Sequence, residues 1–119
     1  MFMQFICYSK CSTCKKAKDW LNEHKIKYSE RDIKENNPTY KELKSWWKLS
    51  NEDLKKFFNT SGLVYKNLNL KEKLPNMSDE EKLKLLASDG MLVKRPLLID
   101  DDKVIIGFKK EKYLTIFSK

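Results

Sequence analysis

The amino-acid sequence predicts a single α/β domain, residues 1–119, in which helices accompany a mixed four-stranded sheet. Three features indicate this class: a short apolar run, "FMQFICY", at residues 2–8; a change to helical spacing from Ser12; and two further apolar runs, "PLLI" and "KVIIGF", near the end. Short apolar runs are typical of buried strands, whereas a recurrence every three or four residues is typical of helices. The predicted order is β-α-β, a helical insertion, and then β-β-α.

The first third of the chain reads as strand, helix, strand. After the run at residues 2–8, the inward positions of the helix fall on one face: Cys14, Ala17, Leu21 and His24. The stretch "KIKYSERDI", residues 25–33, then alternates as a strand does, with Ile26 and Tyr28 on one side. A helix between two strands predicts a parallel pair joined by a crossover.

The middle of the chain is predicted to be helical because it contains repeated helix-start signals. A hydroxyl or carboxyl residue followed three residues later by an acidic residue is the pattern of a helix cap. The three starts are Thr39 with Glu42 after Pro38, Ser50 with Asp53, and Ser78 with Glu81. Gly62 offers a stop for the second of these helices. The leucine and aromatic stripes that follow each start are typical of core residues.

The last third returns to strands, with Asp100, Asp101 and Asp102 as a polar hairpin turn between residues 96–99 and 103–108. The final stretch, residues 109–117, reads as a short helix. Two halves of this kind around one mixed sheet form the thioredoxin-like pattern.

Composition and charge limit the function classes. The 119 residues carry a net charge of +8, but only Arg31 and Arg95 are arginines, and the lysines alternate with acidic residues along the chain. This pattern predicts a solvated, lysine-rich surface and no specific DNA binding, since base recognition favours arginine forks. No apolar run reaches the roughly 20 residues of a membrane span, and the N-terminal run lacks the flanks of a signal peptide. We therefore expect a cytoplasmic protein with no membrane association.

Two cysteines three residues apart, Cys11 and Cys14 in "YSKCSTCKKAKDWL", provide the main chemical signal. Cys11 lies where the first strand ends and the first helix begins, so the free backbone N–H groups of the helix favour its thiolate. Lys10, Lys15 and Lys16 add positive potential. Cys14 lies one turn further on, on the inward face, where its sulfur can meet that of Cys11. We expect a redox pair with Cys11 as the nucleophile and Cys14 as the resolving thiol.

Two other interpretations of the pair remain open at this point. A zinc site would need two more ligands, and the candidates are Cys7, His24 and carboxylates, with no second cysteine pair to supply them. The alternative is that both cysteines are small buried residues. Cys7, inside the first strand, is expected to be an inert core cysteine, and His24, at the end of the first helix, a capping or surface residue.

The sequence resembles the family of thioredoxin-like proteins that includes arsenate reductase C, Spx and YffB. The resemblance covers essentially the whole chain and rests on four stretches: "YSKCSTCKKAKDWLNEHKIKY", "RDIKENNPTYKEL", "LASDGMLVKRPLLID" and "VIIGFKKEKY". It implies that Cys11 is the catalytic cysteine and that Arg95-Pro96 is a cis pair beside the cysteine loop. Arg95 would then bind thiolate or oxyanion, and we expect substrate contacts from Lys10, Ser12, Thr13, Lys15 and Pro96.

The resemblance implies three functions, of which a thiol–disulfide oxidoreductase is the first. It would have no bound cofactor and would take electrons from glutathione, thioredoxin or glutaredoxin. The second is an arsenate reductase, but family members that reduce arsenate use three arginines, and the other two positions fall near Asn59 and Phe108. The third is a redox-sensing regulator that binds RNA polymerase. The glycine with which those regulators contact the polymerase falls near Asp53.

Overall fold

A computed structural model describes residues 3–117 of the chain. Its sheet contains four strands: β1 (Gln4–Cys7), β2 (Ser29–Asp32), β3 (Leu97–Ile99) and β4 (Val104–Ile106). Their order is β2-β1-β3-β4; β1 and β2 are parallel, and the other two pairs are antiparallel. The predicted mixed four-stranded, thioredoxin-like fold is therefore confirmed.

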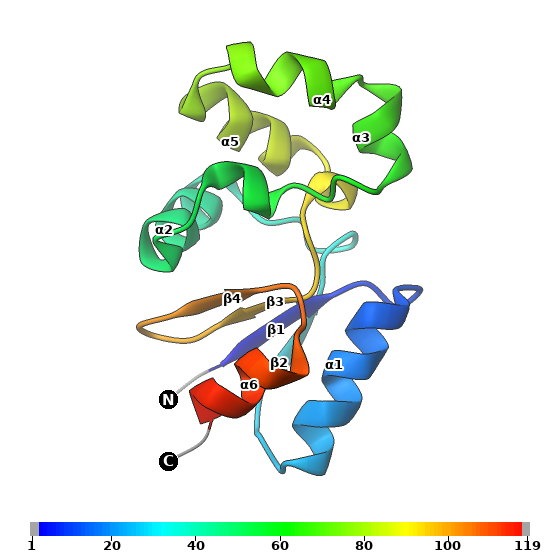
Figure 1. Ribbon diagram of the computed structural model, residues 1–119, viewed down its shortest axis with the longest axis vertical. Coiled ribbons are helices and arrows are strands. Elements are labelled where there is room, and N and C mark those ends of the chain that lie inside the picture. The colour runs from blue at the N-terminus through cyan, green and yellow to red at the C-terminus, as the bar shows by residue number, and fades with distance from the viewer. Residues whose placement is uncertain (1–2, 118–119) are drawn as a thin grey trace.

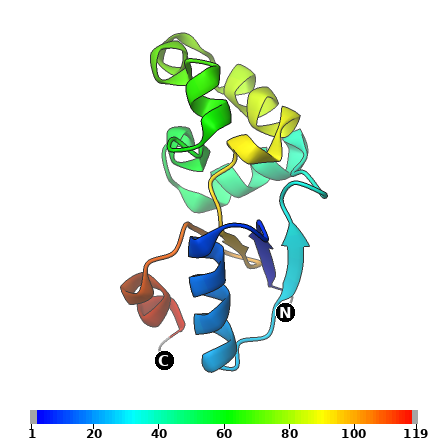
Figure 2. The same ribbon diagram turned by 90° about the vertical axis from the view of Figure 1, so that its right-hand side faces the viewer.

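Helices cover the two faces of this sheet (Figures 1 and 2). On one face lie α1 (Ser12–Glu23) and α6 (Lys110–Phe117). On the other lies the helical insertion, which contains α2 (Tyr40–Ser50), η1 (Leu54–Phe57), α3 (Leu63–Asn67), α4 (Leu70–Lys73), η2 (Leu74–Asn76), α5 (Asp79–Ser88) and η3 (Gly90–Leu92). None of the helices within residues 3–117 is long and apolar enough to cross a bilayer.

The alternation of side chains along each strand divides the core in two. Ile6 and Leu97 pack with the insertion, whereas Phe5, Cys7 and Leu98 pack with α1 and α6. This follows from the period of two in a strand, which sends neighbouring side chains to opposite faces. The apolar run that predicted β1 is therefore buried on both sides, as a central strand requires.

Two of the three predicted helix starts are confirmed as capping boxes. The Thr39 hydroxyl accepts from the Glu42 N–H while the Glu42 carboxylate accepts from the Thr39 N–H, and Ser78 and Glu81 form the same arrangement. Each box satisfies backbone donors that the first turn of a helix leaves free.

The predicted helix start at Ser50 is wrong. Ser50 is the last residue of α2, and its hydroxyl donates to the Trp47 carbonyl at 2.7 Å. Asn51 follows in the left-handed conformation, with φ at 57°, which ends the helix. Asp53 caps the short 3₁₀ helix η1 instead, accepting from the Lys55 N–H. The predicted stop at Gly62 is also wrong, since Gly62 immediately precedes α3.

The second strand is shorter than predicted. Only Ser29–Asp32 pair with β1, in the register Phe5 with Glu30. Ile26 and Tyr28 precede the strand and pack against the core on the α1 side. The alternating apolar pattern therefore reports their burial rather than strand pairing.

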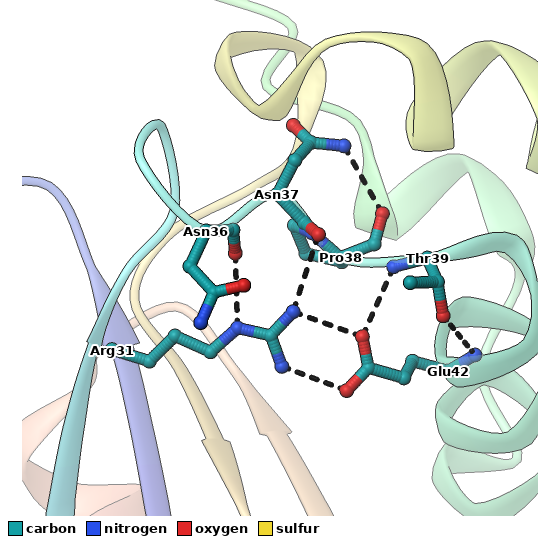
Figure 3. A network of polar contacts seen from close by, with 6 residues as sticks. All are labelled: Arg31, Asn36, Asn37, Pro38, Thr39 and Glu42. Atoms are coloured by element: carbon teal, nitrogen blue, oxygen red, sulfur yellow. Dashed lines mark hydrogen bonds and ion pairs between the residues drawn. The ribbon is translucent and has the colours of Figure 1, made fainter.

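A polar network around Arg31 joins β2 to the insertion (Figure 3). The guanidinium contacts both carboxylate oxygens of Glu42, at 2.7 and 2.9 Å, and donates to the backbone carbonyls of Asn36 and Asn37. The Arg31 side chain is 13% exposed. A bidentate contact of this kind is directional as well as charge-assisted, so it fixes the start of α2 relative to the sheet.

Candidate functional site

The cysteine pair lies at the carboxyl end of β1, where the chain turns into α1. The Cys11 N–H donates to the Tyr8 carbonyl at 3.0 Å, which closes the turn. Cys11 is the N-cap of α1, and its sulfur accepts from the Cys14 N–H at 3.3 Å. The sulfur of Cys14 in turn accepts from the Tyr8 N–H at 3.4 Å. Each sulfur therefore faces a backbone donor; the donor to Cys11 is the one expected from its position at the helix start, whereas the donor to Cys14 comes from the loop.

The two sulfurs differ in exposure. Cys14 is only 3% exposed and belongs to the core between the sheet and α1, whereas Cys11 is partly accessible to solvent. All three cysteines are free thiols. An incoming reagent can therefore reach Cys11 more easily than Cys14.

The electrostatic surroundings separate the two thiols further. At Cys11, burial is the largest influence and raises the pKa, but the Cys14 N–H, the Cys14 thiol and the Arg95 guanidinium together lower the pKa below its ordinary value. At Cys14, burial raises the pKa to about 12. The thiolate is the reactive form of cysteine, so the pair combines an activated outer thiol with a protonated inner one.

Arg95 approaches the site from the segment before β3. Its bond to Pro96 is cis, as expected. The guanidinium lies over the Tyr8 ring, with Cζ 5.1 Å from the ring centroid, and Nη1 donates to the Met91 carbonyl at 3.5 Å. The Arg95 guanidinium therefore lies close to both the Tyr8 ring and Cys11, which is the placement that the family resemblance implies.

A small pocket of about 170 Å³ opens beside the pair. Its lining residues are Cys7, Tyr8, Ser9, Cys11, Cys14, Lys15, Lys18 and Glu30. Of the predicted site residues, only Cys11, Cys14 and Lys15 line it. Lys10, Ser12 and Thr13 are exposed at the start of α1, Arg95 is partly buried and Pro96 is buried; none of these five residues lines the pocket.

The sequence did not predict the opposite wall of this pocket. The Glu30 carboxylate on β2 accepts from the Cys7 thiol at 3.8 Å and contacts the Lys18 ammonium at 2.8 Å. Burial, followed by the charge of Glu30, raises the pKa of Cys7 to about 11. Cys7 is therefore a buried, protonated thiol, in agreement with the inert role expected for it.

His24 has a structural role at the end of α1. His24 is the C-cap of α1; Nδ1 lies 2.9 Å from the Trp20 carbonyl, and the ring stacks on Trp20. The predicted capping role is confirmed, although the side chain is exposed rather than on the inward face.

Across residues 3–117 the structure contains no cluster of three or more His, Cys, Asp or Glu side chains that could hold a metal ion.

Comparison with known proteins agrees with this geometry. The protein YusI of Bacillus subtilis is 55% identical over 113 residues, which span 95% of this chain and 96% of that protein. The regulatory protein MgsR of the same organism is 34% identical, over 98% of this chain and 91% of MgsR. A crystal structure of an ArsC-family-related protein from Bacteroides fragilis is 52% identical, covers 98% of both chains and superposes with a TM-score of 0.94. Residues 7–116 match the pattern of the ArsC family, and this chain is a member of that family.

Proposed function

We propose that the protein is a thiol–disulfide oxidoreductase in which Cys11 attacks and Cys14 resolves. The observation that supports this most directly is the contrast between the two sulfurs: Cys11 is accessible, caps α1 and has a lowered pKa, whereas Cys14 is buried with a pKa of about 12. The first nucleophile must be accessible and ionised, whereas the resolving thiol attacks only its neighbour, so it needs no access to solvent and has to lose its proton only once the mixed disulfide has formed.

The proposed reaction has two steps. The Cys11 thiolate attacks one sulfur of a substrate disulfide, forms a mixed disulfide and releases one substrate thiolate, which takes up a proton. Cys14 then loses its proton and attacks the Cys11 sulfur, so that a Cys11–Cys14 disulfide forms and the second substrate thiol leaves. The substrate gains two electrons and the cysteine pair loses two. Glutathione, thioredoxin or glutaredoxin would reduce the pair again.

A redox-sensing regulator is the second candidate, because MgsR, a regulatory protein, is similar over nearly the full length of both chains. A sensor would use the same pair, but its output would be binding to a protein, with RNA polymerase as the partner that the Spx resemblance implies. An exposed Asp53 stands near the position of the glycine that those regulators use, and a carboxylate there disfavours the same contact.

Turnover distinguishes the two functions. The protein is incubated with a small disulfide, hydroxyethyl disulfide, and with each electron donor in turn. An oxidoreductase gives steady turnover that is lost in Cys11→Ser, whereas Cys14→Ser accumulates the mixed disulfide. A sensor gives at most one turnover, together with polymerase binding in one redox state only. Absence of turnover with every donor contradicts the proposal.

A further inference from the structure

A second pocket, larger than the one beside the cysteine pair, lies apart from that pair. It is a groove of about 690 Å³ between the insertion and the edge of the sheet, where the end of α2 and η1 face β4 and the start of α6 (Figure 1). Its lining residues are Ser50, Glu52, Asp53, Lys55, Lys56, Phe58, Thr60, Lys94, Val104, Ile106, Lys109 and Lys112. None of Cys11, Cys14 and Arg95 is among them.

The walls of the groove carry excess positive charge. Five lysines line it against two acidic residues, and both carboxylates are already engaged. Glu52 pairs with Lys56 at 2.8 Å, and Asp53 caps η1. The other four lysines form no ion pair within residues 3–117. Ammonium groups that face one concave surface create a positive potential that attracts anions.

The floor of the groove is apolar. Phe58 lies beneath it, only 2% exposed, and Val104 and Ile106 on β4 are partly exposed. An apolar floor with positively charged walls suits a ligand that has both an aromatic ring and several negative charges. The volume lies within the roughly 300–1,000 Å³ of small-molecule sites.

We propose that this groove binds a nucleoside polyphosphate, with the nucleobase against the partly exposed side chains of Val104 and Ile106 and the phosphates among the lysines. Five lysines and two carboxylates give the groove a net charge of +3, which offsets most of the charge of about −4 that a triphosphate carries near neutral pH. Both the insertion and the sheet contribute to the site: Lys55 comes from η1, and Val104 and Ile106 come from β4. Lys94 precedes β3, and Lys109 precedes α6. It is independent of the function proposed for the cysteines.

Binding of ATP without divalent cations, measured by calorimetry at two salt concentrations, tests the proposal. Adenosine and tripolyphosphate serve as the two halves of the ligand. ATP should bind with one site per chain and more tightly than either half, because only ATP contacts both the apolar floor of the groove and its lysine walls. Tripolyphosphate binding as tightly as ATP, or no saturable binding of ATP, overturns the proposal.

Matched variants separate a site from diffuse attraction to the basic surface. Lys94→Gln with Lys109→Gln removes two charges from the groove, and Lys71→Gln with Lys73→Gln removes two exposed charges from α4. The groove variant should bind ATP about tenfold more weakly and the α4 variant within about twofold of the parent, since contact charges contribute more than distant screened ones. Equal losses in the two variants refute the site.

Two further controls protect this comparison. Thermal melting of each variant checks that it remains folded, and Lys109→Gln with Lys112→Gln, both exposed, should repeat the loss without touching Lys94. Cys11→Ser should bind ATP as the parent does. A loss of ATP binding in Cys11→Ser would contradict the independence of the groove.

Discussion

Alkylation should separate the cysteines by rate, and their pKa values set the expected ratio. Burial raises the pKa of Cys14 to about 12, so about one Cys14 side chain in 10⁵ is a thiolate at pH 7. The Cys14 N–H, the Cys14 thiol and Arg95 lower the pKa of Cys11 from its ordinary value; an ordinary cysteine, with a pKa of about 8.5, is a thiolate in more than about one side chain in 10² at pH 7. The two thiolate populations therefore differ by about 10³ or more.

Intrinsic nucleophilicity reduces this ratio without reversing it. The more basic thiolate reacts faster, and with a Brønsted coefficient of about 0.45 a difference of three pKa units restores about 20-fold. Cys11 should then react about 50-fold faster than Cys14, before the burial of Cys14 is considered. For Cys7, whose pKa is about 11, the same reasoning gives about tenfold.

The assay is limited alkylation with iodoacetamide at pH 7, followed by mass spectrometry of the cysteine peptides. The same reaction in a high concentration of urea is the control, because unfolding removes the surroundings that separate the thiols and the three peptides should then react at similar rates. Labelling of Cys7 or Cys14 as fast as Cys11 in the folded protein would refute the assignment of the nucleophile.

Three further predictions concern the polar groups around the site and the insertion. Arg31→Lys should lower the free energy of unfolding in urea by about 2 kcal/mol, because lysine cannot make the bidentate contact with Glu42; a change below about 0.5 kcal/mol would show that the network is not needed. Hydrogen bonding from Arg31 lowers the pKa of Glu42, so stability should fall as pH drops from about 5 to about 3, and less steeply in Glu42→Gln. Glu30→Gln should lower the pKa of Cys7, measured by thiolate absorbance in a chain without the other cysteines; an unchanged pKa would show that Glu30 does not contribute to it.

The features that the sequence predicted well are local ones. A capping box is made by residues three apart, and Thr39 with Glu42 is legible without knowing the fold. The position of Cys11 at the start of α1 is local in the same sense. Ser50 shows the limit, because a serine near an acidic residue fits a helix start, yet its hydroxyl can equally donate back to a carbonyl of the preceding turn.

The features that it missed depend on packing between distant segments. Glu30 lines the pocket of the cysteine pair because β2 pairs with β1. On the face covered by α1, its carboxylate contacts Lys18 of α1 and Cys7 of β1. Nothing in the residues around Glu30 indicates this. The pairing of Arg31 with Glu42 likewise requires the insertion to lie on the sheet with the start of α2 close to β2.

The two arginines of the chain have different roles, and this limits the reactions that the site can support. Arg31 is committed to Glu42 and to backbone carbonyls, so Arg95 is the arginine that remains beside Cys11. The family resemblance implies that arsenate reductases supply two further arginines near the positions of Asn59 and Phe108, which are uncharged here. Phe108 packs edge-on against Tyr113, and the Asn59 N–H donates to the Leu92 carbonyl.

This arrangement leads us to expect slow reduction of arsenate. Attack of a thiolate on an oxyanion concentrates negative charge, and loss of one preorganised donor typically costs about 10²–10³ in rate. One guanidinium and a helix start are sufficient to stabilise a single thiolate, which is what disulfide exchange requires. Arsenate turnover, measured with glutathione and with thioredoxin as donor, should therefore be much slower than reduction of a small disulfide through the same Cys11. Efficient arsenate turnover that disappears in Cys11→Ser would contradict this reasoning, because it would mean that lysines such as Lys15 replace the missing arginines.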